Sequence, residues 1–233
     1  MIRGFYSAAS SLLSQQTNLN TIANNIANIS TTAFKPQQAA FASLLYGNLN
    51  GGAGNAISIG SGVKVQKTGI DFTQGDLNRT DMPFDCAILG EGFFSIENRE
   101  DGTITYTRDG SFGVSVDDKD SYLVNSAGNF VLDSEGDKIE LKEDFDATKI
   151  GVFIFQNNYG LELIGGNQFK ATDASGEPEI IEESNIKVGY LENSGVQISE
   201  EMVKMIEASK GFSFNSRIVQ AADEMEKIIN QLR

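Results

Sequence analysis

Apolar residues at both ends of this chain recur with the spacing of a narrow helical seam, and this feature limits the possible folds more than any other. In residues 1–33 the seam positions are separated alternately by four and three residues, and they are Phe5, Ala9, Leu12, Gln16, Leu19, Ala23 and Ile26. Asn28 and then Pro36 end the pattern. The spacing predicts an N-terminal helix with one face suited to a coiled coil.

The C-terminal end predicts a second helix of the same kind. Ser199 is a candidate N-cap, and Glu200 and Glu201 fall in the first turn, where the helix dipole favours acids. The apolar residues at helical spacing are Met202, Met205, Ile206, Phe212, Val219, Ala222, Met225, Ile229 and Leu232. The seam slips between Phe212 and Ala222, which predicts a local unwinding or a change of contacting face there.

Two helices at opposite ends of a chain must come together if their seams are to pair. A coil of two helices buries little apolar surface by itself, and stacking many copies side by side supplies the missing burial. The pattern therefore favours a helical filament, with an inner tube of terminal helices and an outer shell formed by the rest of the chain.

The outer face of the N-terminal helix is polar but uncharged, since residues 1–33 contain Arg3 and no acid. Uncharged polar groups can pack against a neighbour without the cost of burying a charge, so we expect this helix to be enclosed on several sides by other helices. A partly disordered polar tail is the alternative. Because isolated helices this polar are marginal in water, we expect both ends to be largely disordered in a monomer.

The middle of the chain consists of short alternating runs separated by Gly, Asn and Asp. They recur roughly every 8 to 12 residues, which is typical of an all-β barrel or sandwich. The runs are Phe93–Glu97, Ile104–Thr107, Phe112–Val116, Tyr122–Asn125, Phe130–Asp133, Lys138–Leu141 and Ile150–Phe155. The glycine-rich run at 50–55 predicts a flexible loop between the N-terminal part and this β region.

These observations together predict an α+β fold, in which a mainly-β central domain is combined with long terminal helices. The expected divisions are an N-terminal helix at 1–33, an extended glycine-rich connecting region at 34–72, a β domain at 73–190 and a C-terminal helix at 191–233. The two helices are expected to pair as one discontinuous assembly domain.

Charge separates the regions sharply. The formal net charge is −14, and residues 34–195 carry all of it, with 26 acids and 12 bases, while residues 196–233 contain six acids and five bases. Such a chain is repelled by nucleic acid and by anionic lipid. No run of apolar residues is long enough to span a membrane, and the start of the chain lacks a cleavable secretory signal.

The residue types needed for catalysis are scarce. The chain has no histidine, and its one cysteine, Cys86, lies in a strand-like run, which favours a buried and inert thiol. The acidic runs at 117–120 and 133–137 lack the glycine and ligand spacing of calcium loops and are expected to be hairpin turns. We therefore predict no catalytic residue, cofactor, metal or small-molecule substrate.

Several motifs resemble those of the flagellar rod and hook protein family. Segment 23–35 is similar to a family signature whose matching residues here are Asn24, Asn25, Asn28, Phe34 and Lys35. Segments 72–77, 90–94 and 106–112 look like motifs of the family's β domain, and segments 189–206 and 215–225 look like its C-terminal end. The resemblance covers nearly the whole chain.

This resemblance implies a structural subunit of the bacterial flagellar basal-body rod, located in the cell envelope. Such a subunit polymerises helically with copies of itself, with other rod proteins and with the hook, and the resulting shaft transmits motor torque. The resemblance also implies export by the flagellar type III apparatus without a cleaved signal. Within the family the distal rod proteins are the most similar, followed by the proximal ones.

The chain departs from the family pattern at a few positions. Ala33 occupies a position where glycine is usual, which suggests that the turn after the helix need not adopt a positive φ. Gly195 replaces a common asparagine, and residues 210–212 replace a usual Arg-Ala-Tyr.

Two other functions fit the same residues. One is a secreted β-rich adhesive or glycan-binding protein whose terminal helices only dimerise it. The other is a regulator or export chaperone that forms a complex in the cytoplasm without entering the rod.

Overall fold

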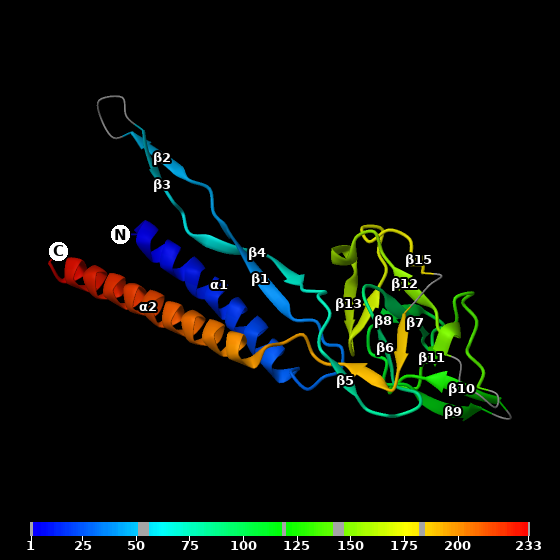
Figure 1. Cartoon of the computed structure of the whole chain (residues 1–233). Coiled ribbons are helices and arrows are strands. Elements are labelled where there is room, and N and C mark those ends of the chain that lie inside the picture. Colours follow the sequence, from blue (N-terminus) through cyan, green and yellow to red (C-terminus); the bar gives the residue numbers. More distant parts are fainter. Residues whose placement is uncertain (1, 51–55, 118–119, 142–146, 182–184, 233) are drawn as a thin grey trace. The chain divides into compact units, whose positions relative to one another are not determined.

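The computed structural model describes residues 2–50, 56–117, 120–141, 147–181 and 185–232 (Figure 1). The chain divides into two compact units, and each is assembled from distant segments. The first, here the helical unit, comprises Met1–Ala27, Gln37–Ile70 and Gln197–Arg233. The second, here the β unit, comprises Asn28–Pro36 and Asp71–Val196.

Two long helices from opposite ends of the chain pack side by side in the helical unit. They are α1 (Ile2–Ala27) and α2 (Ile198–Gln231), drawn in blue and orange-red in Figure 1. The predicted α+β class and the pairing of the terminal helices are confirmed. Among the helices in the described ranges, none combines the length and the apolar character needed to cross a bilayer.

The start and the middle of α2 differ from expectation. Gln197 and not Ser199 occupies the N-cap position, and its side chain makes no capping hydrogen bond. The helix also continues without unwinding through the region where the seam slips. The Asn215 side chain donates to the Gly211 carbonyl oxygen, four residues earlier, and to the Ser11 hydroxyl of α1, so a polar residue here supports the helix pair.

A two-stranded ribbon lies beside α1 in the helical unit. Strands β1 (Gln37–Ser43) and β4 (Val63–Ile70) pair antiparallel, with an irregularity at Ala40/Phe41, and β2 (Gly47–Asn50) pairs antiparallel with β3 (Ala56–Ile59). The Ser14 hydroxyl donates to the Val63 carbonyl oxygen at 3.3 Å. The second neighbour of α1 within the chain is therefore a β ribbon and not another helix. Of the glycine-rich run at 50–55 that was expected to be a flexible loop, Asn50 ends β2, and residues 51–55 lie outside the described residues.

The described residues of the β unit form thirteen short strands, and every pairing among them is antiparallel. The largest sheet has the order β13-β14-β8-β7-β11-β10-β9, with β12 pairing to both β7 and β15, while β6 pairs with β16 and β5 with β17. The strands are β5 (Leu77–Arg79), β6 (Cys86–Ile88), β7 (Phe93–Glu97), β8 (Ile104–Thr107), β9 (Gly113–Asp117), β10 (Asp120–Val124), β11 (Phe130–Val131), β12 (Val152–Ile154), β13 (Glu162–Gly165), β14 (Gln168–Lys170), β15 (Glu179–Ile180), β16 (Ile186–Val188) and β17 (Tyr190–Glu192). Short 3-10 turns occur at Ala147–Lys149 and Asn158–Gly160.

The predicted alternating runs overlap β7, β8, β9, β10, β11 and β12, and the strand-like run around Cys86 contains β6. No strand was predicted at β5 or at β13–β17. The bounds predicted for β7 and β8 are confirmed. The run Lys138–Leu141 was predicted as a strand, but it makes only isolated bridges, Leu132↔Lys138 and Tyr122↔Glu140. The acidic run before it forms the predicted turn, in which Gly136 N–H donates to the Asp133 carbonyl oxygen. In the other acidic run, residues 118–119 lie outside the described ranges.

The β unit has its own hydrophobic core. Strands from several pairs contribute buried side chains to one cluster, which consists of Cys86, Ile88, Phe94, Phe112, Leu123, Val131, Ile139, Ile150 and Val152. A second group of aromatic rings packs edge to face around Phe93, with Phe72, Phe155 and Phe169 within 6.0 Å between centroids. Burial of this apolar surface stabilises the β unit.

The turn that follows α1 contradicts the expectation drawn from Ala33. This residue has a φ of 54°, in the left-handed region that glycine adopts without strain. Its N–H donates to the Glu192 carbonyl oxygen at 2.8 Å, and the side chain is buried. The backbone hydrogen bonds of the turn therefore impose the positive φ even though alanine has replaced glycine.

Candidate assembly surfaces and buried polar junctions

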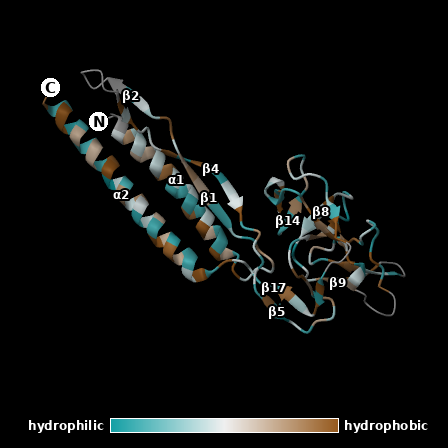
Figure 2. Ribbon diagram, turned by 45° about the horizontal axis from the view of Figure 1, so that its top comes forward, coloured by the Kyte–Doolittle hydropathy of each residue, from teal (hydrophilic) through white to brown (hydrophobic). Residues whose placement is uncertain are grey.

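Much of α2, including many of its large apolar side chains, remains exposed within a single chain. Only Glu201 and Ala208 are buried in this helix of 34 residues. Brown, hydrophobic segments recur along the length of α2 in Figure 2. The exposed large apolar side chains here named the outer stripe are Met202, Val203, Ile206, Phe214, Ile218, Met225, Ile228 and Ile229. At about 100° per residue, six of these positions lie more than 90° around the helix from Ala208, whereas Ile218 and Ile229 lie nearer to its side. The exposed charged residues Lys210, Arg217 and Glu224 share the outer half with the six.

The exposed face of α1 is also suited to contact with protein. Its exposed large apolar side chains are Phe5, Tyr6 and Leu13, and no charged residue follows Arg3 in the helix. Scattered apolar side chains are normal on a protein surface, whereas a continuous apolar face marks an interaction site. Because α1 carries no charge after Arg3, other proteins can cover its exposed face without burying a charged side chain of α1.

The predicted seam residues are divided between inner and outer faces. On α1, Ala9, Leu12, Leu19 and Ile26 are half-buried, while Phe5 and Ala23 are exposed. On α2, the half-buried positions are Met205, Phe212 and Val219, and the exposed ones are Met202, Met225 and Ile229. The side chains that α1 buries are Ala8, Ser14, Thr21, Ile22 and Asn25. A single chain thus covers only part of each predicted seam.

Asn25 joins three elements inside the helical unit. Its amide oxygen accepts the Gln37 N–H at 2.9 Å, and its amide nitrogen donates to the Gln37 carbonyl oxygen at 2.8 Å, in the manner of a neighbouring strand. The same nitrogen donates to the Glu201 carboxylate at 3.2 Å. Glu201 also accepts from Lys204 at 2.7 Å. The end of α1, the start of β1 and the first turn of α2 therefore meet at one buried amide.

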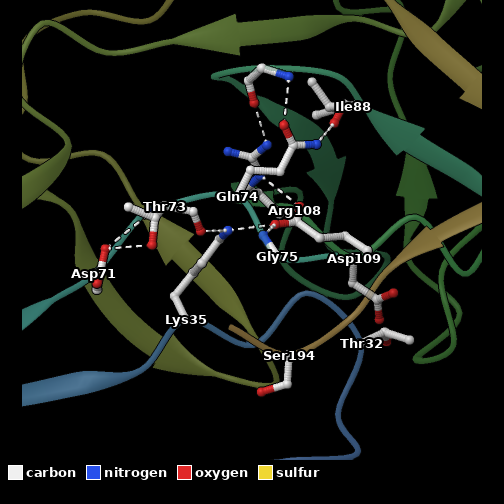
Figure 3. Close-up of polar contacts among 12 residues, drawn as sticks. Thr32, Lys35, Asp71, Thr73, Gln74, Gly75, Ile88, Arg108, Asp109 and Ser194 are labelled. Atoms are coloured by element: carbon white, nitrogen blue, oxygen red, sulfur yellow. Dashed lines mark hydrogen bonds and ion pairs between the residues drawn. The ribbon is translucent and has the colours of Figure 1, made fainter. Parts of the chain in front are cut away.

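Lys35 belongs to a buried charged cluster in the β unit (Figure 3). Its ammonium group donates to the Glu192 carboxylate at 2.6 Å and to the Thr73 carbonyl oxygen at 2.7 Å. The other oxygen of Glu192 accepts from Arg108 Nε at 3.1 Å, and the first also accepts the Gly75 N–H at 2.8 Å. These ionic side chains are 1–3% exposed. One carboxylate therefore satisfies two buried cations.

Burial controls the electrostatics of this cluster. Loss of hydration lowers the pKa of Lys35, and the nearby Glu192 carboxylate opposes that shift. Arg108 also donates to the Gly90 carbonyl oxygen, so its guanidinium group is held from two sides. The chemistry of the cluster suits the fastening of chain segments, because every strong donor is already engaged by a carboxylate or a carbonyl oxygen.

The other signature residues have separate environments. Phe34 is buried, Asn28 is half-buried and Asn24 is exposed. Sequence reasoning identified Asn25 and Lys35 but missed their partners Glu201, Glu192 and Arg108. No local signal could have paired Lys35 with Glu192, because 157 residues separate them along the chain.

Cys86 fits the prediction of a structural thiol. It is 1% exposed and sits in the core of the β unit. Burial, reinforced by the nearby Asp85 carboxylate, raises the pKa of Cys86 to about 12. A thiol held in this form is a poor nucleophile at neutral pH.

Comparison with known proteins gives a consistent result along the whole chain. Residues 5–35 match the family model "Flagella basal body rod protein", residues 87–153 match "Flagellar hook protein FlgE/F/G D1 domain", and residues 187–232 match "Flagellar basal body rod FlgEFG protein C-terminal". The chain is 35% identical to flagellar basal-body rod protein FlgG of Borreliella burgdorferi, over 100% of this chain and 99% of that protein. It is 34% identical to FlgG of Agrobacterium fabrum over 99% of both. It is also 36% identical to the flagellar hook protein FlgE of Helicobacter mustelae, over 56% of this chain and 30% of that protein.

Proposed function

The chain belongs to the FlgG family of flagellar basal-body rod proteins, and from that premise we propose that it polymerises with copies of itself through α1 and α2. It is a structural subunit of the flagellar rod, as the sequence motifs predicted. The name FlgG, which the relatives carry, agrees with the predicted resemblance to distal rod proteins. The relatives do not support the alternative of a secreted adhesive or glycan-binding protein.

The outer stripe of α2 is the observation that carries the proposal. Eight large apolar side chains remain exposed on a helix that already packs against α1. Covering them with the helices of other copies removes apolar surface from water, which is the main driving force for association. The exposed face of α1 carries no charged residue after Arg3, so α1 itself loses no ion hydration when it meets the stripe.

Further partners follow from the family. Rod and hook proteins assemble with one another in the flagellum. We propose that this chain contacts other rod proteins and the hook at the two ends of the stretch of rod that its own copies form. We also propose that it reaches the cell envelope through the flagellar type III apparatus, without a cleaved signal. In this role the chain acts by assembly and not by catalysis.

Substitution of Phe214 tests the proposal. This side chain is 66% exposed in the middle of the outer stripe, so Phe214→Ser should leave the fold of a single chain intact. In a strain of the source organism that lacks the gene, restoration with Phe214→Ser should give short or missing rods and poor swimming. Electron microscopy of basal bodies and a swimming assay provide the measurements.

Val116→Ser is the matched control. Val116 is 71% exposed on β9 of the β unit, so Val116→Ser also removes an exposed apolar side chain, but outside the outer stripe. We expect normal rods with this variant. Normal rods with Phe214→Ser, at an unchanged protein level, would contradict a role of the stripe in polymerisation.

A further inference from the structure

The segment that follows α1 and the segment that precedes α2 are hydrogen-bonded to each other within the β unit. Ala33 N–H donates to the Glu192 carbonyl oxygen at 2.8 Å, and Gly195 N–H donates to the Phe34 carbonyl oxygen at 2.9 Å. Glu192 is also the last residue of β17, which pairs with β5. The segment just before α2 is therefore an integral strand of the β unit and lies against the segment just after α1.

The side chain of Glu192 accepts hydrogen bonds from three parts of the β unit that are distant in sequence. Its three partners, Lys35, Gly75 and Arg108, precede it by 157, 117 and 84 residues. The carboxylate is 2% exposed, and the two cations are 1% and 3% exposed. Without this carboxylate two buried cations would have no anionic partner among the contacts that hold them.

We propose that Glu192 is a closing clasp, so that folding of the β unit and docking of the segment before α2 are one cooperative event. The physical reason is the asymmetry of buried ion pairs. A satisfied pair adds little net stability, whereas loss of one partner strands a buried charge at a large cost. The β unit is therefore stable with Glu192 in place and strongly destabilised without it.

The position of Glu192 in the chain gives the clasp a consequence for the order of folding. Lys35 and Arg108 are synthesised before Glu192, and Glu192 is synthesised before α2. Before Glu192 has been synthesised and has docked, Lys35 and Arg108 lack this carboxylate partner in the folded arrangement. Completion of the β unit thus waits for the segment that leads into the assembly helix.

The opposing possibility is that the 192–196 segment opens locally while the rest of the β unit stays folded. Cys86 distinguishes the two in the full-length chain. It is the only cysteine, it is 1% exposed in the core, and its pKa of about 12 suppresses reaction in the folded state. Its labelling by a thiol reagent under native conditions therefore reports opening of the core.

Glu192→Gln is the decisive variant, because it removes the charge and keeps the shape. We expect Cys86 to be labelled about 100-fold faster or more in this variant, the ratio that stranding a buried ion implies. Glu162→Gln, which removes an exposed carboxylate from β13 in the same unit, should leave the labelling rate within about twofold of the wild type. Adding Lys35→Met to Glu192→Gln removes one stranded cation and should slow labelling again by about tenfold.

Hydrogen exchange completes the test. If Cys86 labelling in Glu192→Gln stays near the wild-type rate while the amides of Ala33 and Gly195 exchange faster, the segment opens by itself and the clasp proposal is wrong. If Glu192→Gln does not fold, Cys86 labelling is measured in Lys35→Met instead, because this variant keeps Glu192 paired with Arg108. Cooperative closing then predicts about tenfold faster labelling, and an unchanged rate contradicts it. All measurements use purified monomer, so the result is independent of the proposed polymerisation.

Discussion

At the scale of single residues, Cys86 gives the chain a pH dependence with a defined sign. The folded-state pKa of about 12 lies above the ordinary value of 9.0 for a cysteine thiol. The group therefore contributes stability that is fully present below pH 9 and is lost as pH rises toward 12. At pH 10.5 the loss should be about 2 kcal/mol, at about 1.4 kcal/mol per pKa unit.

Urea unfolding at several pH values measures this loss. Cys86→Ala is the comparison, because Tyr106, whose pKa burial also raises, titrates in both proteins. The unfolding free energy of the wild type minus that of Cys86→Ala should fall by about 2 kcal/mol between pH 8 and pH 10.5. A constant difference would mean that the thiol titrates normally in the folded chain.

Ala33 provides a second prediction at this scale. Alanine in the left-handed region costs about 1 kcal/mol relative to glycine, partly offset by the extra freedom of glycine in the unfolded chain. Ala33→Gly should therefore raise the unfolding free energy of the β unit by about 0.5 kcal/mol, while Ala33→Val should lower it. Denaturant unfolding of both variants checks the order, and a more stable valine variant would argue against the positive φ.

Residue-level reasoning from sequence succeeded where chemistry is local. The inert character of Cys86 followed from its strand-like neighbours and from the absence of histidine. It failed at Ala33, because the φ there is set by a hydrogen bond to Glu192, far along the chain. It also found Lys35 through the signature but could not find the carboxylate that neutralises it, since burial of an ion pair depends on tertiary contacts.

At the scale of elements, the helix pair contains an avoidable weakness. Gly211 lies inside α2, where glycine costs about 1 kcal/mol relative to alanine. A Cβ added there would approach Gln15 Nε2 at 3.4 Å, an ordinary van der Waals distance. Gly211→Ala should therefore raise helix content in a monomer and stabilise the helical unit by about 0.5–1 kcal/mol.

Circular dichroism at 222 nm during thermal unfolding provides the measurement. Gly62→Ala is the contrasting variant in the same unit. Gly62 has a φ of 117°, and an added Cβ would collide with the Ser10 hydroxyl, so we expect it to lower stability. A destabilising Gly211→Ala would imply that α1 and α2 lie closer together than their described packing.

Elements were predictable in proportion to the regularity of their pattern. Long periodic segments gave both helices, and short runs bounded by Gly, Asn and Asp gave β7 and β8 with their bounds, although β7 buries four successive side chains. The ribbon formed by β1 and β4 was expected only as an extended connection, because its alternation is weak and its pairing is held partly by packing on α1. The start of α2 was displaced because capping depends on backbone geometry as well as on residue type.

At the scale of the whole molecule, the sequence indicated function through the distribution of charge and apolar residues. The acid excess is confined to the middle of the chain, and the helices that must pack together are nearly free of it. The structure adds that each compact unit combines segments from early and late in the chain. Each also has its own buried junction, Asn25 with Glu201 in one and Lys35 with Glu192 in the other.

Cryo-electron microscopy of rods isolated from the source organism tests the central claim most directly. We expect the outer stripe of α2, with Phe214 near its middle, to be covered by helices of neighbouring copies. We also expect α1 to present its uncharged face to other subunits. Rods in which neighbouring copies touch only through their β units, with the outer stripe open to solvent, would contradict this claim.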